Sequence, residues 1–343
     1  MKAVILAGGR GTRLAPVTHG KVPKPMAELM GAPVLEHIVR HLARCGFTEQ
    51  CCALGHMPDE IRRWFGDGSR FGVRMEYRQE EKPLGTAGAV KSCMDFVGRE
   101  SFLVISGDAA CDLDLTRLWR AHHRSRAVVT MALYPHPAPL PYGLAVTDRK
   151  GFVKSFIEKP GWDRVVTDLV NTGIYVIAPE AMAFVPEDAE YDFSKDLFPR
   201  LLKAGRPMLG VPLDGYWRDI GDPASYHRAN LDAWEGRICL PTEDPLPPPE
   251  TAAAELAPGA YTCRIYCPVP RRARMMRELS EGLMEAGADL TDGITLRQVP
   301  GGVHIAPCPD REALCIESDD PDTVRRFEAL THRLRARLEG GTP

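Results

Sequence analysis

The stretch AGGRGTRL, at residues 7–14, is the segment whose residue types point most directly to chemistry. Glycines that directly follow a strand let backbone N–H groups hold phosphate oxygens, because no side chain stands in the way. Arg13 within the stretch and Lys24 beyond it add positive charge that would stabilise a reacting triphosphate. The spacing fits neither a Walker A loop nor a dinucleotide-binding fingerprint. The segment predicts a phosphate-binding turn of another kind; the plainer alternative is a tight surface turn with basic residues nearby.

Further polar or glycine-rich loops follow along the chain. A second glycine-rich loop, PLGTAGA at residues 83–89, opens a helix, and Asp108 follows the buried apolar run 102–106. Ligands bind to open α/β sheets where strands end, so such loops are expected to line one crevice. The remaining loops are Glu158-Lys159-Pro160, Asn171-Thr172-Gly173 and YWRDIG at residues 216–221, which contains Asp219.

The elements that position these loops alternate between strand-like and helix-like patterns. An apolar helical pattern at residues 35–42 ends at Gly46, a common helix stop. This alternation is typical of an α/β fold in which helices cover a mostly parallel sheet. Strands are predicted at residues 2–7, 102–106, 127–133, 143–147 and 152–157.

The composition changes beyond the first 237 residues, which we expect to form one catalytic domain. Residues 238–259 are rich in proline and show no helical or strand period, so they predict a semi-rigid linker. Residues 260–343 predict a small α+β domain. Its expected elements are a strand at 261–267, a helix at 271–286, two or three short strands between 293 and 317, and a closing helix at 322–338.

The six loops, in this order and spacing, resemble the sugar-1-phosphate nucleotidyltransferase family from residue 1 to about residue 237. The resemblance implies a Rossmann-like sheet of the nucleotide-diphospho-sugar transferase type. It also implies an enzyme that couples a nucleoside triphosphate to a sugar 1-phosphate and releases pyrophosphate. Residues 66–74 and 192–200 are most similar to bacterial mannose-1-phosphate guanylyltransferases, which favours GTP and mannose 1-phosphate as substrates and GDP-mannose as product.

The resemblance also implies roles for individual residues. Arg13 and Lys24 would be catalytic, and Asp108 and Asp219 would bind Mg²⁺ together with phosphates and waters. Asp112 could assist them, or could equally be a loop acid or a helix cap. The implied nucleotide-binding residues are Leu6, Ala7, Gly8, Gly9, Gly11, Thr12, Arg13, Glu80, Gly85, Thr86 and Asp108. The implied sugar-phosphate-binding residues are Tyr142, Gly143, Glu158, Lys159, Asn171 and Thr172.

The choice of base depends on the residues before the second glycine-rich loop. Relatives that use uridine or thymidine triphosphate commonly carry a glutamine there, whereas this chain carries Glu80. An ionised carboxylate only accepts hydrogen bonds, and guanine offers two adjacent donors that it can take together. Gln79 could still bind a pyrimidine if the loop were shifted by one residue. GTP is therefore favoured, and a UTP- or dTTP-dependent glucose-1-phosphate enzyme is the alternative.

A non-catalytic sensor of nucleotide sugars is a third alternative, although it would not need both metal-binding carboxylates. The tail resembles the C-terminal domain of phosphohexomutases but lacks their phosphoserine and metal loops. Residues 306–310 read APCPD where that domain has a phosphate clamp. We therefore expect the tail to be non-catalytic and to serve packing, regulation or dimerisation, so that a homodimer is one expected assembly.

The overall composition excludes several classes of partner. A net charge of −3 gives no reason to expect nucleic acid or an anionic membrane. No signal peptide or membrane-spanning stretch is predicted, so a cytoplasmic protein is expected. The ten cysteines include no C-x-x-C pair, and we expect reduced thiols that fill the core instead of a metal site.

Overall fold

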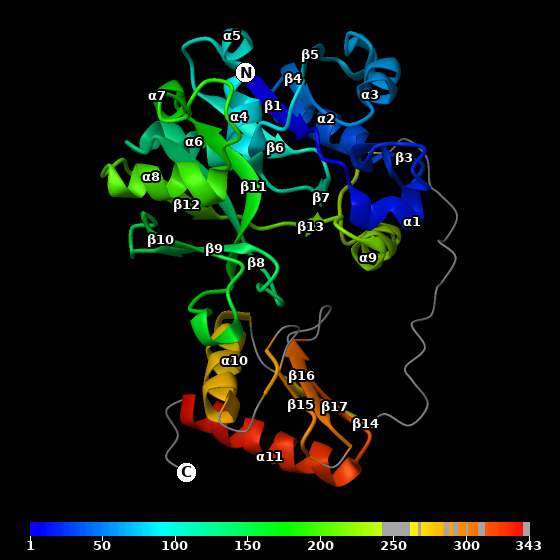
Figure 1. Ribbon diagram of the computed structural model, residues 1–343, viewed down its shortest axis with the longest axis vertical. Coiled ribbons are helices and arrows are strands. Elements are labelled where there is room, and N and C mark those ends of the chain that lie inside the picture. Colours follow the sequence, from blue (N-terminus) through cyan, green and yellow to red (C-terminus); the bar gives the residue numbers. More distant parts are fainter. Residues whose placement is uncertain are drawn as a thin grey trace. The chain divides into compact units, whose positions relative to one another are not determined.

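The computed structural model describes residues 1–241, 261–266, 269–284, 288–290, 294–299, 301–307 and 313–338 (Figure 1). The chain divides into two compact units. Unit 1 comprises residues 1–133, 147–154 and 172–250, and unit 2 comprises residues 134–146, 155–171 and 251–343. Two short segments from the first 237 residues thus belong to the same unit as the tail. Most of the expected linker, at residues 242–260, lies outside the described residues.

The large sheet is built around β1 (Lys2–Ala7), which runs parallel to β4 (Glu49–Leu54) and to β6 (Phe102–Ser106). On the other side of β4 lies β5 (Arg74–Gln79), also parallel. The strand β11 (Leu169–Ile177) pairs with β6 in the antiparallel sense. The predicted α/β fold with a mostly parallel central sheet is confirmed.

Four more strands complete this nine-stranded sheet, whose main path runs β10-β9-β11-β6-β1-β4-β5. The strand β8 pairs with β11 and, in parallel, with β12. The predicted strands are found close to their expected bounds, with β8 shifted by two residues. These four strands are β8 (Val129–Pro135), β9 (Gly143–Thr147), β10 (Val153–Glu158) and β12 (Met208–Pro212).

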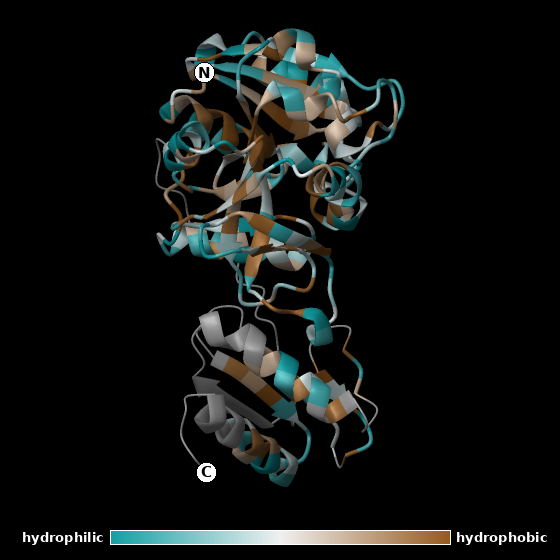
Figure 2. Cartoon of the chain, turned by 90° about the vertical axis from the view of Figure 1, so that its left-hand side faces the viewer, coloured by the Kyte–Doolittle hydropathy of each residue, from teal (hydrophilic) through white to brown (hydrophobic). Residues whose placement is uncertain are grey.

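The core of unit 1 lies between the sheet and its helices. Val4 and Ile5 of β1 are fully buried, as expected for a strand that is covered on both faces. The helix α2 (Val34–Arg44) buries Leu35 and Leu42 and is followed by Gly46 in a left-handed conformation, as predicted. Figure 2 shows the same arrangement as apolar strands inside and polar helix surfaces outside.

The other helices of unit 1 range from one turn to the 12 residues of α9 (Pro223–Trp234). They are α1 (Ala15–Thr18), α3 (Pro58–Phe65), α4 (Gly85–Lys91), α5 (Met94–Val97), α6 (Leu115–Arg124), α7 (Pro179–Met182), α8 (Phe198–Lys203) and α9 (Pro223–Trp234). The shorter helical turns are η1 (Thr12–Leu14), η2 (Lys24–Met26), η3 (Ser69–Phe71) and η5 (Phe193–Leu197). Two small two-stranded sheets pair β2 (Glu28–Leu29) with β3 (Ala32–Pro33) and β7 (Ala109–Cys111) with β13 (Trp217–Asp219).

Unit 2 contains an antiparallel sheet of order β14-β17-β16-β15, packed against α11 (Pro321–Leu338), and a second helix, α10 (Val269–Met284). It also contains the turn η4 (Trp162–Arg164). These elements match the predicted strand and helix order of the tail; expected element ends at residues 267 and 285–286 lie outside the described part. The strands are β14 (Tyr261–Tyr266), β15 (Ile294–Leu296), β16 (Val303–Pro307) and β17 (Ala313–Ser318).

Two expectations from composition can be compared with the structure. Within the described residues, no helix is long and apolar enough to cross a membrane. Reduced thiols are found at Cys45, Cys51, Cys52, Cys93, Cys111 and Cys239. The expectation of reduced cysteines is wrong for Cys315, which is disulfide-bonded.

Candidate active site

The glycine-rich turn begins where β1 ends, and its conformation depends on Gly11. Gly11 has a φ of +61°, and a Cβ there would lie 2.5 Å from Cβ of Lys24. Both facts favour glycine, because other residues rarely adopt this φ and none leaves room for Lys24 to approach. The carbonyl oxygen of Gly8 accepts a hydrogen bond from the backbone N–H of His56, 3.2 Å away. The turn is thus fixed on the loop after β4 at one end and brings Lys24 close at the other.

Lys24 holds the two predicted metal-binding carboxylates together. Its Nζ lies 2.6 Å from Oδ2 of Asp108 and 3.4 Å from Oδ1 of Asp219. Asp108 follows β6, and Asp219 ends β13, which is paired with β7 so that Asp219 lies opposite Ala109. Strand pairing therefore brings these two carboxylates together from distant parts of the sequence. The sequence prediction that Lys24, Asp108 and Asp219 converge agrees with this geometry.

The electrostatics of this cluster keep Lys24 charged. Burial alone would lower the pKa of Lys24, but the negative charges of Asp108 and Asp219 outweigh burial and raise it above its usual value. Burial and the like charge of Asp108 raise the pKa of Asp219, and Lys24 opposes them. The cluster therefore consists of one ammonium group in contact with two carboxylates that repel each other.

Arg13 approaches the same cluster from the glycine-rich turn. A Cβ built on Gly221 would lie 2.9 Å from Oδ2 of Asp219 and 3.3 Å from Nη2 of Arg13. Both groups thus border the small space that Gly221 leaves open. The charge of Arg13 also lowers the pKa of Asp219 against the effect of burial.

The donor set fits a magnesium ion that is bound partly by its substrate. Among the described residues, no three His, Cys, Asp or Glu side chains gather as a metal site. Mg²⁺ commonly takes one or two carboxylates and completes its shell with phosphates and waters. Asp108 and Asp219 supply two such oxygen donors.

Asp112 has a structural role in this part of the molecule. Its carboxylate accepts hydrogen bonds from the backbone N–H groups of Tyr216, at 2.6 Å, and Cys239, at 2.8 Å. Of the three roles that the sequence left open, these hydrogen bonds favour the loop acid. Asp112 fixes the chain on either side of α9.

A cavity of about 660 Å³ opens beside the glycine-rich turn, entirely within unit 1. The cavity is lined by seven of the residues that the sequence analysis assigns to the nucleotide: Leu6, Gly8, Gly9, Glu80, Gly85, Thr86 and Asp108. Ala7, Gly11, Thr12 and Arg13 were predicted as well but do not line it: Ala7 is buried in the sheet, and the turn carries the other three toward Lys24. The cavity is also lined by residues that were not assigned to the nucleotide: Arg10, Gly55, His56, Glu81, Lys82, Pro83, Ala89, Ser106 and Asp192.

Glu80, and not Gln79, lines this cavity. Oε1 of Gln79 accepts a hydrogen bond of 3.1 Å from Arg62 on the exposed surface. Oε2 of Glu80 accepts one of 3.2 Å from the backbone N–H of Leu84. Burial raises the pKa of Glu80. Of these two neighbouring side chains, the carboxylate of Glu80 is the one that lines the cavity.

The first turn of α4 is fixed on the start of η5. The hydroxyl group of Thr86 donates to Oδ2 of Asp192 at 2.8 Å and accepts from the N–H of Phe193 at 2.9 Å. Gly85 has a φ of +68°, and a Cβ there would lie 2.7 Å from the carbonyl oxygen of Tyr191. Thr86 therefore fixes the start of α4 to η5. Its hydrogen bond with Asp192 also holds Asp192 at the cavity wall.

Five of the six predicted sugar-phosphate residues belong to unit 2: Tyr142, Gly143, Glu158, Lys159 and Asn171. A Cβ on Gly143 would lie 2.7 Å from Oε2 of Glu158, and the N–H of Lys159 donates to the carbonyl oxygen of Tyr142 at 3.2 Å. Lys159 has a φ of +42°, which is unusual for a residue with a side chain. Tyr142 and Gly143, at the start of β9, thus lie beside Glu158 and Lys159, at the end of β10.

The sixth predicted residue, Thr172, belongs to unit 1 and lies in the core. Its side chain is 3% exposed, and its hydroxyl group donates to the carbonyl oxygen of Ala132 at 2.8 Å. The structure therefore does not bring this side chain to a ligand.

Comparison with known proteins is consistent with this geometry. The profile of the family described as nucleotidyl transferase matches residues 2–236. A UTP–glucose-1-phosphate uridylyltransferase of Synechocystis is 38% identical over 67% of this chain and 62% of its own length. A mannose-1-phosphate guanylyltransferase of Mycobacterium tuberculosis is 34% identical over 68% of this chain and 65% of its own length. The chain thus spans less than two thirds of the length of these relatives.

Solved structures show the same fold. HddC from Yersinia pseudotuberculosis, complexed with GMP-PN, superimposes with a TM-score of 0.58 at 28% identity. The match covers 67% of this chain and 97% of that one. A putative glucose-1-phosphate thymidylyltransferase from Bacillus anthracis gives a TM-score of 0.59 at 28% identity, over 67% of this chain and 94% of that one.

Proposed function

Because the chain belongs to the nucleotidyl transferase family, we propose that it joins a nucleoside triphosphate to a sugar 1-phosphate and releases pyrophosphate. The observation that carries this proposal is the contact of Lys24 with both Asp108 and Asp219 beside the glycine-rich turn. A protein that only bound nucleotides would have no need for a lysine and two partly buried carboxylates at this point. That arrangement suits a reaction in which phosphate charge moves.

The proposed reaction needs no nucleophile from the protein. An oxygen of the sugar phosphate attacks the α-phosphorus in line, and pyrophosphate leaves on the opposite side. Lys24, whose raised pKa keeps it an ammonium group at neutral pH, and Arg13 stabilise the negative charge. Asp108 and Asp219 would hold Mg²⁺, which supplies further positive charge when it is bound.

We propose GTP as the nucleotide because of Glu80. Guanine presents its N1–H and 2-amino groups side by side, and one carboxylate can accept from both. Uracil and thymine present one donor between two carbonyls, which would face the Glu80 carboxylate unfavourably. Gln79, the residue that could have served a pyrimidine, is bonded to Arg62 instead. Mannose 1-phosphate is the proposed sugar substrate, and GDP-mannose the product.

The second candidate is a UTP- or dTTP-dependent enzyme that acts on glucose 1-phosphate. It is favoured by the Synechocystis uridylyltransferase, which is 38% identical over the matched part. The two candidates share every step except the recognition of the base and of the sugar hydroxyl groups.

A substrate screen separates these candidates. Pyrophosphate release is measured for GTP, UTP, dTTP, ATP and CTP, each with mannose, glucose and heptose 1-phosphates, in the presence of Mg²⁺. We expect the highest kcat/KM for GTP with mannose 1-phosphate. A preference for UTP with glucose 1-phosphate would support the second candidate. No release with any pair would leave a nucleotide-sugar sensor as the remaining interpretation.

A further inference from the structure

The turn that follows Lys159 is anchored by a buried tryptophan. Trp162, the first residue of η4, is 1% exposed, and Val165, which follows the turn, is fully buried. The N–H of Val165 donates to the carbonyl oxygen of Trp162 at 3.2 Å and closes the turn. At its other end, the backbone N–H of Lys159 is bonded to Tyr142. The position of Lys159 is therefore set between a strand end and a buried aromatic side chain.

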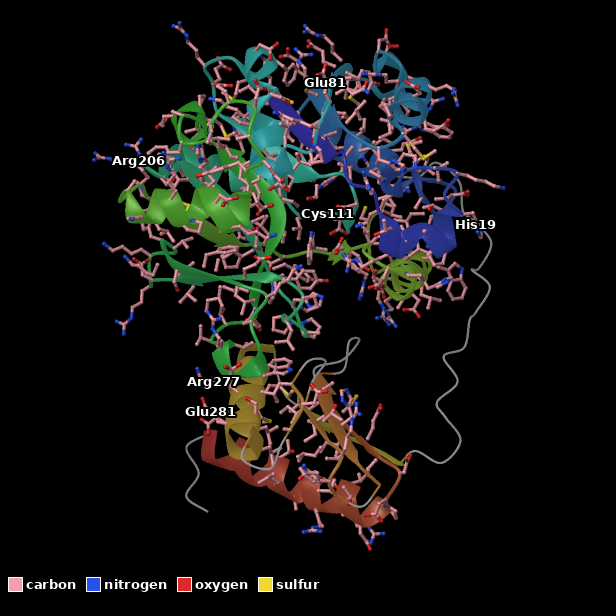
Figure 3. The ribbon with its side chains drawn as sticks, viewed as in Figure 1. His19, Glu81, Cys111, Arg206, Arg277 and Glu281 are labelled. Carbon is pink, nitrogen blue, oxygen red and sulfur yellow. The ribbon has the colours of Figure 1, made fainter. Side chains whose placement is uncertain are left out.

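The element that covers this turn comes from the tail of the chain. Within unit 2, η4 packs against α10 (Val269–Met284), and Figure 1 shows the green turn at one end of the yellow helix. Met276 and Leu279 of α10 are buried. Arg277 and Glu281 lie on the side of α10 away from the four-stranded sheet (Figure 3). The part of the tail that packs against η4 is thus α10.

The side chain of Trp162 is held by packing and not by a hydrogen bond. Nε1 of Trp162 is buried and has no hydrogen-bond partner in the described structure. A side chain held in this way contributes through its volume, so a residue of similar shape would replace it with little loss. Lys159 adopts a left-handed backbone conformation that persists only where the surroundings impose it.

We propose that α10 positions the sugar-phosphate turn through Trp162, so that the tail is a working part of substrate recognition. Trp162 is a positioning residue and contacts no substrate itself. This inference rests on the proposed function, which assigns Glu158 and Lys159 to the sugar phosphate. It assigns the tail to one substrate only, because the nucleotide cavity is lined wholly by unit 1.

The test compares four variants of the full chain, with the substrate pair that the wild type uses. Trp162→Ala removes the anchor, Trp162→Phe keeps most of its volume, and Met276→Ala removes a buried side chain of α10. Glu281→Gln is the control, because this exposed residue lies on the same helix. The KM for each substrate and hydrogen exchange of residues 155–165 and 6–14 are measured.

For Trp162→Ala we expect about a tenfold rise in the KM for the sugar 1-phosphate, because small misplacements of a binding group are costly. The KM for the nucleotide should stay within about twofold, and exchange should rise at residues 155–165 only. Met276→Ala should act in the same direction more weakly, and Trp162→Phe and Glu281→Gln should resemble the wild type.

Three results would overturn the inference. They are an unchanged sugar-phosphate KM with unchanged exchange in Trp162→Ala, an equal rise in both KM values, and a Trp162→Phe variant as impaired as Trp162→Ala. If Trp162→Ala does not fold, Met276→Ala decides by the same criteria. If the wild type releases no pyrophosphate with any substrate pair, the proposed function fails. The hydrogen-exchange measurement still stands in that case, and unchanged exchange at residues 155–165 in Trp162→Ala would overturn the coupling of α10 to the turn.

Discussion

The two units hold their candidate ligand groups in different ways. In unit 1, charged side chains at strand ends contact each other directly, as Lys24 does with Asp108 and Asp219. In unit 2, the turn at Lys159 is held by a backbone hydrogen bond and by the packing of Trp162. Substitutions in unit 1 should therefore alter the chemical step or the affinity for the nucleotide, whereas substitutions in unit 2 should alter the affinity for the sugar 1-phosphate.

The largest effect is expected from the carboxylates of unit 1. Asp108→Asn and Asp219→Asn should each lower kcat by on the order of 10² or more, because each removes charge that holds the metal ion. Steady-state kinetics at several Mg²⁺ concentrations, with circular dichroism as a check on folding, measure this effect. Near-normal turnover of either variant at saturating Mg²⁺ would contradict the assignment.

A smaller effect is expected at the base. Glu80→Gln should lower the ratio of kcat/KM for GTP to that for UTP by roughly 10²-fold, because an amide presents a donor beside an acceptor. Gln79→Glu serves as the control, since residue 79 points to Arg62 on the surface. If the ratio changes in neither variant, the side chain at position 80 does not read the base.

A pair of glycine variants tests the comparison between the units directly. Gly9→Ala, whose Cβ meets no protein atom within 4 Å, should raise the KM for the nucleotide by about tenfold through the bound phosphates. Gly143→Ala, whose Cβ would lie 2.7 Å from Oε2 of Glu158, should raise the KM for the sugar 1-phosphate by a similar factor. If the KM for the same substrate rose in both variants, the two units would not each bind a different substrate.

The smallest effect concerns stability and pH. Burial raises the pKa of Glu80, so the fold favours the neutral carboxyl, and the stability present below the unfolded pKa is lost as pH rises through the folded pKa. Glu80→Gln does not titrate. The difference between the Tm of this variant and that of the wild type should therefore shift in favour of the variant as the pH rises from 4 to 7. A difference that is constant with pH would mean that burial does not disfavour the charged form.

Much of unit 1 can be predicted from the sequence because its signals are local. The strands at residues 2–7 and 102–106 have the predicted bounds, since short apolar runs that end in glycine or aspartate have few other interpretations. Asp108 could be placed at a ligand-binding edge because it follows a buried strand of the sheet. The contact of Asp219 with the same cluster depends on the antiparallel pairing of β13 with β7, which no local pattern reveals. The cavity wall was harder to predict: Asp192 reaches it through a hydrogen bond with Thr86, which no local pattern reveals.

Unit 2 was less predictable because its packing joins distant segments. The proline-rich composition of residues 238–259 suggests that the chain divides there. The contact of η4 with α10 joins segments on either side of that stretch, and nothing in the pattern around Trp162 indicates its partner.

Thr172 was placed with the sugar phosphate by its position in a motif, but the alternation of β11 turns its side chain into the core.

Isotope transfer tests the central claim most directly. Mannose 1-phosphate labelled with ¹⁸O in its phosphate group is incubated with GTP, Mg²⁺ and the full chain, and the products are analysed by mass spectrometry. The proposed attack on the α-phosphorus predicts that all of the label enters GDP-mannose and that the pyrophosphate carries none. Labelled inorganic phosphate, labelled pyrophosphate or the absence of a nucleotide sugar would contradict it.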